Sequence, residues 1–119
     1  MINALQSTAV YLITGYTDMR KAINGLSLIV SEQLGHDPFD GSLFVFCNKG
    51  RDKLKILHWQ HNGFWLYYRR LEKGKFKWPI NEIAGEHIAL SYRELSWLLD
   101  GLSLLQNQAH PAVSGFSNN

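Results

Sequence analysis

The sequence has only one cysteine, Cys47, so it can form neither an internal disulfide nor a zinc site built from several cysteines. It also lacks any apolar run long enough to span a bilayer, and its N-terminus lacks the charged segment of a signal peptide. These absences favour a cytoplasmic protein with no membrane association. The 119 residues are 45% hydrophobic and 18% charged, which is typical of one globular domain.

Patterns typical of catalysis are missing as well. The five histidines do not have the spacing of a zinc-binding helix pair, and there is no glycine-rich phosphate loop or nucleophile motif. Asp37 and Asp40 are explained as turn residues around Pro38. We therefore predict no catalytic residue, no metal site and no cofactor, and a protein that is not an enzyme.

What the sequence does contain is a concentration of positive charge. Nine of its twelve Lys and Arg residues lie between Lys49 and Lys77 together with only two acids, which gives nine minus two, or +7. The rest of the chain has three bases against eight acids, or −5, so the overall +2 conceals a charge dipole. The same segment holds six Trp, Tyr and Phe residues, and Trp78 follows it directly. Interleaved basic and aromatic side chains are typical of nucleic-acid surfaces, although a solvated strand face with core aromatics is the alternative.

Alternating and β-branched residues predict the strands. We expect strands over 9–14, 43–48, 53–60, 64–71 and 76–78. The connection between the third and fourth strands is His61-Asn62-Gly63, in which Asn-Gly is a strong hairpin signal. Pro79 would end the last strand.

Two helices are expected, one between the first two strands and one near the C-terminus. Thr17 or Asp18 would cap the first helix, and Gly35 would end it. Ser91 and Glu94 form a capping-box pattern at the start of the second. The predicted fold is therefore α+β, with an antiparallel β-meander of about five strands packed with two main helices. One domain would span 1–105, followed by a flexible C-terminal tail at 106–119.

Strand alternation also predicts which side chains share a face of the sheet. We expect a core face formed by Leu54, Ile56, Phe64, Leu66 and Tyr68. The opposite, outer face would carry Lys53, Lys55, Trp59, Trp65, Tyr67 and Arg69. Both helices would cover one face and leave the other at least partly open.

Five segments, taken in order, resemble a known family. They are 14–26, 37–46, 55–59, 62–71 and 74–79, and they include Thr-Gly-Tyr-Thr-Asp-Met-Arg-Lys and Asp-Pro-Phe-Asp-Gly. The chain resembles the small accessory protein, TnpB or Orf2, of the insertion-sequence sixty-six family over roughly residues 8 to 103. Such elements typically encode a DDE-type transposase and two small proteins. The resemblance implies a role in assisting transposition, with the transposase and the second small protein as partners.

We predict a DNA-binding surface and keep one alternative. The predicted phosphate contacts are Arg20, Lys21, Lys49, Arg51, Lys53, Lys55, Arg69, Arg70, Lys73, Lys75 and Lys77, and the predicted aromatic contacts are Trp59, Trp65 and Tyr67. Arg20 and Lys21 have a second interpretation, a salt bridge to Asp18 or to a distant acid. The alternative function is a protein-interaction module that docks on the transposase or its other small partner without touching DNA.

Overall fold

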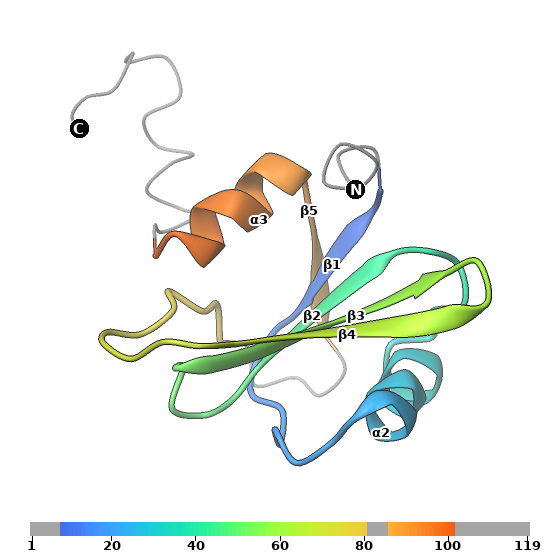
Figure 1. The fold of residues 1–119 in the computed structure, drawn as a ribbon, viewed down its shortest axis with the longest axis horizontal. Helices are drawn as coiled ribbons and strands as arrows, with labels where there is room; N and C mark the ends of the chain where they lie inside the picture. The colour runs from blue at the N-terminus through green and yellow to red at the C-terminus, as the bar shows by residue number, and fades with distance from the viewer. Residues whose placement is uncertain (1–7, 81–85, 102–119) are drawn as a thin grey trace.

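The computed structural model describes residues 8–80 and 86–101 of the chain. Its centre is a five-stranded sheet with a helix on either side, as Figure 1 shows. The strands are β1 (Val10–Ile13), β2 (Leu43–Cys47), β3 (Lys53–Gln60), β4 (Gly63–Arg70) and β5 (His87–Leu90). The helical segments are α2 (Ile23–Leu28), the π-helix η1 (Ile29–Gln33) that continues it, and α3 (Tyr92–Leu99).

The strand order is β4-β3-β2-β1-β5. Strands β2, β3 and β4 form the predicted antiparallel meander, whereas β1 pairs parallel to β2 and antiparallel to β5. The parallel pair follows from the helix between β1 and β2, because a crossover returns the chain in the same direction. The predicted α+β class, with about five strands and two main helices, is confirmed.

The prediction of a fifth strand at 76–78 is wrong. The fifth strand is β5, an edge strand whose four residues include the exposed Ile88. The 76–78 segment alternates as predicted, with Phe76 and Trp78 buried and Lys77 exposed. Its backbone nevertheless forms no ladder, because the Phe76 N–H donates to the Arg51 carbonyl and the Trp78 N–H to the Phe76 carbonyl.

The predicted start of the first helix is also wrong. The Thr17 N–H donates to the Cys47 carbonyl, and the Asp18 carboxylate accepts from the Arg20 N–H at 2.9 Å, which closes a turn. The helix α2 begins five residues later, with Ala22 as its extended N-cap. The helical stretch ends as expected, because Gly35 follows Leu34 with a φ of +69°.

Each face of the sheet has its own core, so the prediction that both helices cover one face is wrong. On one face α3 contributes Leu95 and Leu98, while α2 and η1 contribute Leu26 and Val30 on the other. All five residues of β2 are buried, as expected for a strand covered on both sides. The capping box at Ser91 and Glu94 is confirmed at the start of α3. The predicted domain end at 105 and the tail at 106–119 lie outside the described residues.

The predicted faces of the β3–β4 hairpin are wrong for one of the two strands. Leu54 lies opposite Arg69 and Ile56 opposite Tyr67, and directly opposed residues share a face. Trp65, Tyr67 and Arg69 therefore lie on the α3 face with Leu54 and Ile56. Phe64, Leu66, Tyr68 and Arg70 lie on the α2 face with Lys53, Lys55 and Trp59.

The turn explains this reversal. Gln60 pairs with Gly63, so the turn has two residues, His61 and Asn62, instead of the expected three. A shift of one residue in register moves every side chain of a strand to the other face. The turn also places the positive φ, 58°, at His61.

Candidate nucleic-acid interface

The turn between β2 and β3 is fixed by hydrogen bonds of two side chains. The Asn48 Oδ1 accepts from the backbone N–H groups of Asp52 and Lys53, each at 3.1 Å. In return, the Asn48 amide donates to the Asp52 carboxylate at 2.8 Å, which lowers the pKa of that carboxyl. Arg51 sits in this turn with a φ of 60°. The turn therefore presents Lys49 and Arg51 from a defined backbone.

The segment after β4 lies against this turn. The Leu71 N–H donates to the Asp52 carbonyl and the Phe76 N–H to the Arg51 carbonyl, both at 2.7 Å. Phe76 is fully buried, and the buried Trp78 ring donates from Nε1 to the Ile13 carbonyl at 3.1 Å. Because these aromatic side chains anchor the segment, the lysines beside them point into solvent.

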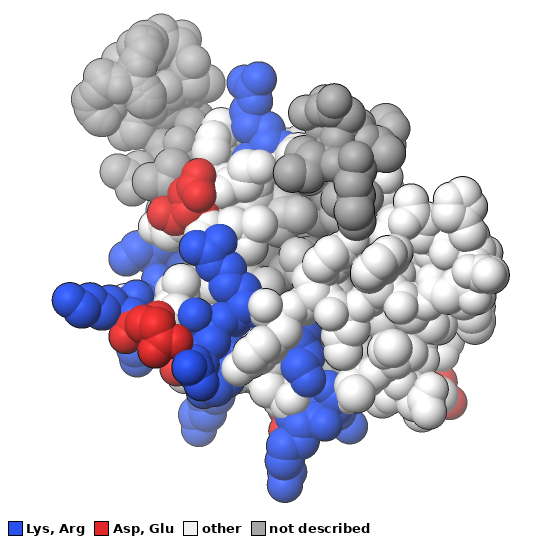
Figure 2. Space-filling view, viewed as in Figure 1, with Lys and Arg blue, Asp and Glu red and all other residues white. Residues whose placement is uncertain are grey.

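We call this part of the molecule the basic end. It comprises the β2–β3 turn, the adjoining ends of β3 and β4, and the segment after β4. Its basic residues are Lys49, Arg51, Lys53, Arg69, Arg70, Lys73, Lys75 and Lys77. With Asp52 and Glu72 as its acids, eight bases against two acids leave +6. Figure 2 shows Lys and Arg gathered at the left of the molecule and few charges at the right, where Figure 1 places the turn between β3 and β4. We call the part of the molecule around this turn the hairpin end.

Most of these cations have no partner of opposite charge in the part of the chain that the structure describes. Arg70 pairs with Glu72 at 2.9 Å, and Lys53 approaches Asp52 at 3.4 Å. Within residues 8–80 and 86–101, the other six bases of the basic end form no ion pair. Unpaired, exposed cations at one end of a molecule create a field that attracts polyanions.

Three of the predicted DNA-binding residues lie elsewhere, before α2 and beneath it. Arg20 pairs with Asp18 at 2.7 Å, so the predicted salt bridge is confirmed, and it lowers the pKa of Asp18 to about 2. The Lys55 ammonium donates to the carbonyls of Met19 and Lys21, each at 2.8 Å. Arg20 and Lys55 thus already have partners within the fold, whereas Lys21 is exposed.

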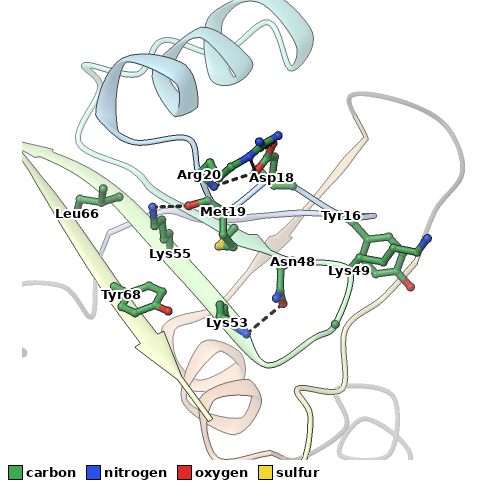
Figure 3. A pocket seen from close by; sticks show the side chains of 12 residues that line it. Tyr16, Asp18, Met19, Arg20, Asn48, Lys49, Lys53, Lys55, Leu66 and Tyr68 are labelled. Atoms are coloured by element: carbon green, nitrogen blue, oxygen red, sulfur yellow. Dashed lines mark hydrogen bonds and ion pairs between the residues drawn. The ribbon is translucent and has the colours of Figure 1, made fainter. Parts of the chain in front are cut away.

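An open groove of about 910 Å³ lies between the basic end and the start of α2. Its lining consists of 16–20, 48–50, Lys53, Lys55, Leu66 and Tyr68. Figure 3 shows Tyr68 and Leu66 on one side and Tyr16 and Lys49 on the other, with Met19 and Lys53 between them. The groove therefore combines cationic side chains with aromatic rings.

The predicted aromatic contacts do not form one surface. Trp59 packs edge-on against Phe39, with ring centroids 4.9 Å apart, at the hairpin end of the α2 face. Trp65 stacks on Tyr67 at 6.2 Å on the α3 face. Trp59 is therefore separated from the basic end, and Trp65 and Tyr67 lie on the opposite face of the sheet from the groove.

Sequence reasoning missed the two aromatic residues of the groove. The sequence pattern predicts Tyr68 in the core, yet Tyr68 is 53% exposed, and Tyr16 is 42% exposed. A two-residue turn in the hairpin would have placed Tyr68 opposite Lys55 and identified it. No spacing in the sequence indicates Tyr16, because it lies in an irregular loop after β1.

Other chemistry in the described part of the chain is limited. Burial raises the pKa of the Cys47 thiol to about 12, which keeps it protonated. Residues 8–80 and 86–101 contain no group of three or more His, Cys, Asp or Glu side chains arranged to hold a metal ion. Nor do these residues include a helix with the length and apolar character required to cross a membrane.

Comparison with known proteins connects this structure to a family. Residues 8–109 match the family described as IS66 Orf2 like protein. The chain belongs to the IS66 Orf2-like family. The match includes the basic end, the groove and both helices.

Two relatives come from Sinorhizobium fredii, and both are named there as uncharacterized proteins. The protein y4hO is 40% identical over 102 residues, covering 86% of this chain and 87% of the relative. The protein y4jC is 32% identical over 111 residues, covering 93% of each chain. No solved structure matches this IS66 Orf2-like protein. Family membership supports a transposition-associated accessory role.

Proposed function

We propose that this IS66 Orf2-like protein is a non-catalytic accessory factor of transposition that binds transposon DNA through its basic end. The observation that carries the proposal is the group of six basic side chains there without an ion-pair partner in the described residues. Each such cation can neutralise a phosphate and release a condensed counterion. Strand cleavage is assigned to the separate transposase chain.

The anchoring of the basic end supports this proposal. Lys75 and Lys77 flank the buried Phe76, so their backbone is held before any ligand arrives. Lys49 and Arg51 come from a turn fixed by Asn48 and Asp52. Because the main chain is already fixed at these positions, less conformational entropy is lost when the side chains bind DNA phosphates.

Salt-dependent binding tests the proposal. A labelled 20-base-pair duplex is titrated with the protein at 50 and 200 mM salt, and binding is followed by fluorescence anisotropy. Six phosphate contacts predict an affinity loss of roughly a thousandfold between these concentrations. Lys75→Gln combined with Lys77→Gln should reduce the slope of log affinity against log salt by about 2.

The control variant is Arg93→Glu, which changes the net charge by the same amount at an exposed position on α3. It should keep the wild-type slope, because its charge lies outside the basic end. Absence of salt-dependent binding, or an equal loss of slope in Arg93→Glu, would show that the basic end is not the DNA-binding surface.

The second candidate function is docking on a protein partner, the transposase or the other small protein of the element. It is favoured by the hairpin end, where residues 56–68 contain no Lys, Arg, Asp or Glu. Phe39 is 55% and Trp65 49% exposed there, and exposed aromatic side chains frequently anchor protein interfaces.

A pull-down with the purified transposase after nuclease treatment separates the two functions. Docking predicts that capture persists without DNA and is lost in Phe39→Ser combined with Trp65→Ser. Lys75→Gln combined with Lys77→Gln should leave this capture unchanged. If capture disappears on nuclease treatment, DNA bridges the two proteins and the docking function is wrong.

A further inference from the structure

We infer that the groove beside the basic end binds an unpaired nucleotide, with its base on the rings of Tyr16 or Tyr68 and its phosphate at Lys49 and Lys53. This inference rests on the proposed DNA-binding function and narrows it. It concerns which form of DNA the protein prefers.

The groove has the size and the aromatic surface for this ligand. Its volume of about 910 Å³ lies within the range of small-molecule sites. Tyr16 and Tyr68 expose about half of their surface, 42% and 53%. Among the described residues, neither ring is paired with another aromatic ring. The Lys55 ammonium lies over the Tyr68 ring, so a base would stack on the part of that ring that remains exposed.

The positive charges that are available for a phosphate lie on one side of the groove, at Lys49 and Lys53. Asp18 is the acid among its lining residues, and Arg20 neutralises it at 2.7 Å. The Lys55 ammonium lies 5.9 Å from the centre of the Tyr68 ring but donates to backbone carbonyls. Lys49 has no ion pair in the described residues, and Lys53 has only a 3.4 Å approach to Asp52.

An unpaired nucleotide can contact both the tyrosine rings and the lysines of the groove, whereas a duplex can contact only the lysines. In a duplex the bases stack on one another, so the tyrosine rings could not reach a base face. A base in a single strand, gap or end is free to stack on an aromatic side chain, and this contact tolerates any base. Because the groove adjoins the basic end, phosphates on either side of the bound nucleotide could reach Lys49 and the lysines after β4.

The test compares three DNA ligands of equal length at one salt concentration. These are a labelled twelve-base thymidine strand, the same strand with abasic sites throughout its centre, and a duplex of the same length. The wild-type protein should bind the thymidine strand roughly tenfold or more tightly than the abasic strand, as one stacked base predicts. Tyr16→Leu combined with Tyr68→Leu should remove this difference and change duplex affinity less than about twofold.

Trp65→Leu is the matched control, because it removes a similarly exposed ring from the opposite face of β4. It should keep the preference for the thymidine strand. Equal binding of the thymidine and abasic strands by the wild type overturns the inference, and this result needs no variant to fold. Duplex binding that remains salt-dependent would then leave the proposed function standing, whereas no binding to any of the ligands would reject both.

Discussion

The Lys55 ammonium lies 2.8 Å from the carbonyl oxygen of Met19 and joins β3 to the loop before α2. A second bond of the same length reaches the Lys21 carbonyl. These carbonyls precede the helix and have no helical N–H partner, so the lysine satisfies them. Lys55 is therefore a structural residue, even though it lies in the most basic part of the sequence.

Lys55→Met should lower the free energy of unfolding by about 1–3 kcal/mol, because hydrogen bonds to a charged donor are lost. Lys53→Met is the control, since Lys53 lies on the same face with only an exposed ion pair, and should cost less than about 1 kcal/mol. Urea unfolding followed by circular dichroism measures both. Equal stability of the two variants would contradict the structural role of Lys55.

The Trp78 indole should matter for stability in the same way. Trp78→Phe removes the buried hydrogen bond to the Ile13 carbonyl and leaves a smaller ring, at a cost of about 1–3 kcal/mol. Trp65→Phe, at a 49% exposed position, should cost at most about 0.5 kcal/mol. Thermal unfolding of the two variants compares them, and a similar midpoint for both would show that Trp78 does not anchor the segment after β4.

The capping box of α3 provides a third stability test. The Ser91 hydroxyl accepts from the Glu94 N–H at 3.0 Å, so Ser91→Ala should cost about 1 kcal/mol. Ser96→Ala, within the same helix, should have almost no effect because alanine favours the helix interior. Urea unfolding is again the measurement. A Ser96 variant as unstable as the Ser91 variant would mean that packing against the sheet, and not the cap, determines the cost.

Local patterns predicted what local interactions determine. Strands β1 to β4 follow from runs of β-branched, aromatic and alternating residues, and α3 begins at Ser91 because the capping box needs only residues three apart. The helix between β1 and β2 also indicates that these strands are parallel, whereas the predicted meander made every strand pair antiparallel. The concentration of charge was visible because most of its residues are consecutive in the chain.

Features that depend on distant partners were not predictable in the same way. The edge strand β5 has no alternation of its own and pairs through β1, about 75 residues earlier. Asp18 resembles a helix cap, but its carboxylate is taken by Arg20, and the helix starts later. The prediction placed Tyr67 instead of Tyr68 on the face of Lys55, because a difference of one residue in the length of the turn decides which tyrosine lies there.

The Asp18–Arg20 pair predicts a measurable titration. The pKa of Asp18 is lowered from 3.8 to about 2, chiefly by the hydrogen bond from the Arg20 side chain. Since the folded-state pKa is depressed, the pair stabilises the fold above about pH 4, and this contribution is lost as pH falls towards 2. In Arg20→Gln, carbon-13 NMR of the Asp18 carboxyl should show a pKa part of the way back to 3.8. An unchanged value would show that the backbone N–H alone causes the shift.

Cys47 should be unreactive in the folded protein and reactive once the chain unfolds. Its side chain is fully buried in β2, and burial raises the pKa of the thiol to about 12. At pH 8 only about one thiol in ten thousand is then ionised, and the thiolate is the nucleophile. A disulfide reagent that releases a coloured product on reaction with a thiol should therefore label the native protein slowly, at a rate set by opening of the sheet. In concentrated urea the same reagent should label Cys47 without this delay. Ser31→Cys supplies the matched control, because it places a thiol at an exposed position of η1 that should react without unfolding. Rapid labelling of the native wild-type chain would mean that β2 is not covered on both faces.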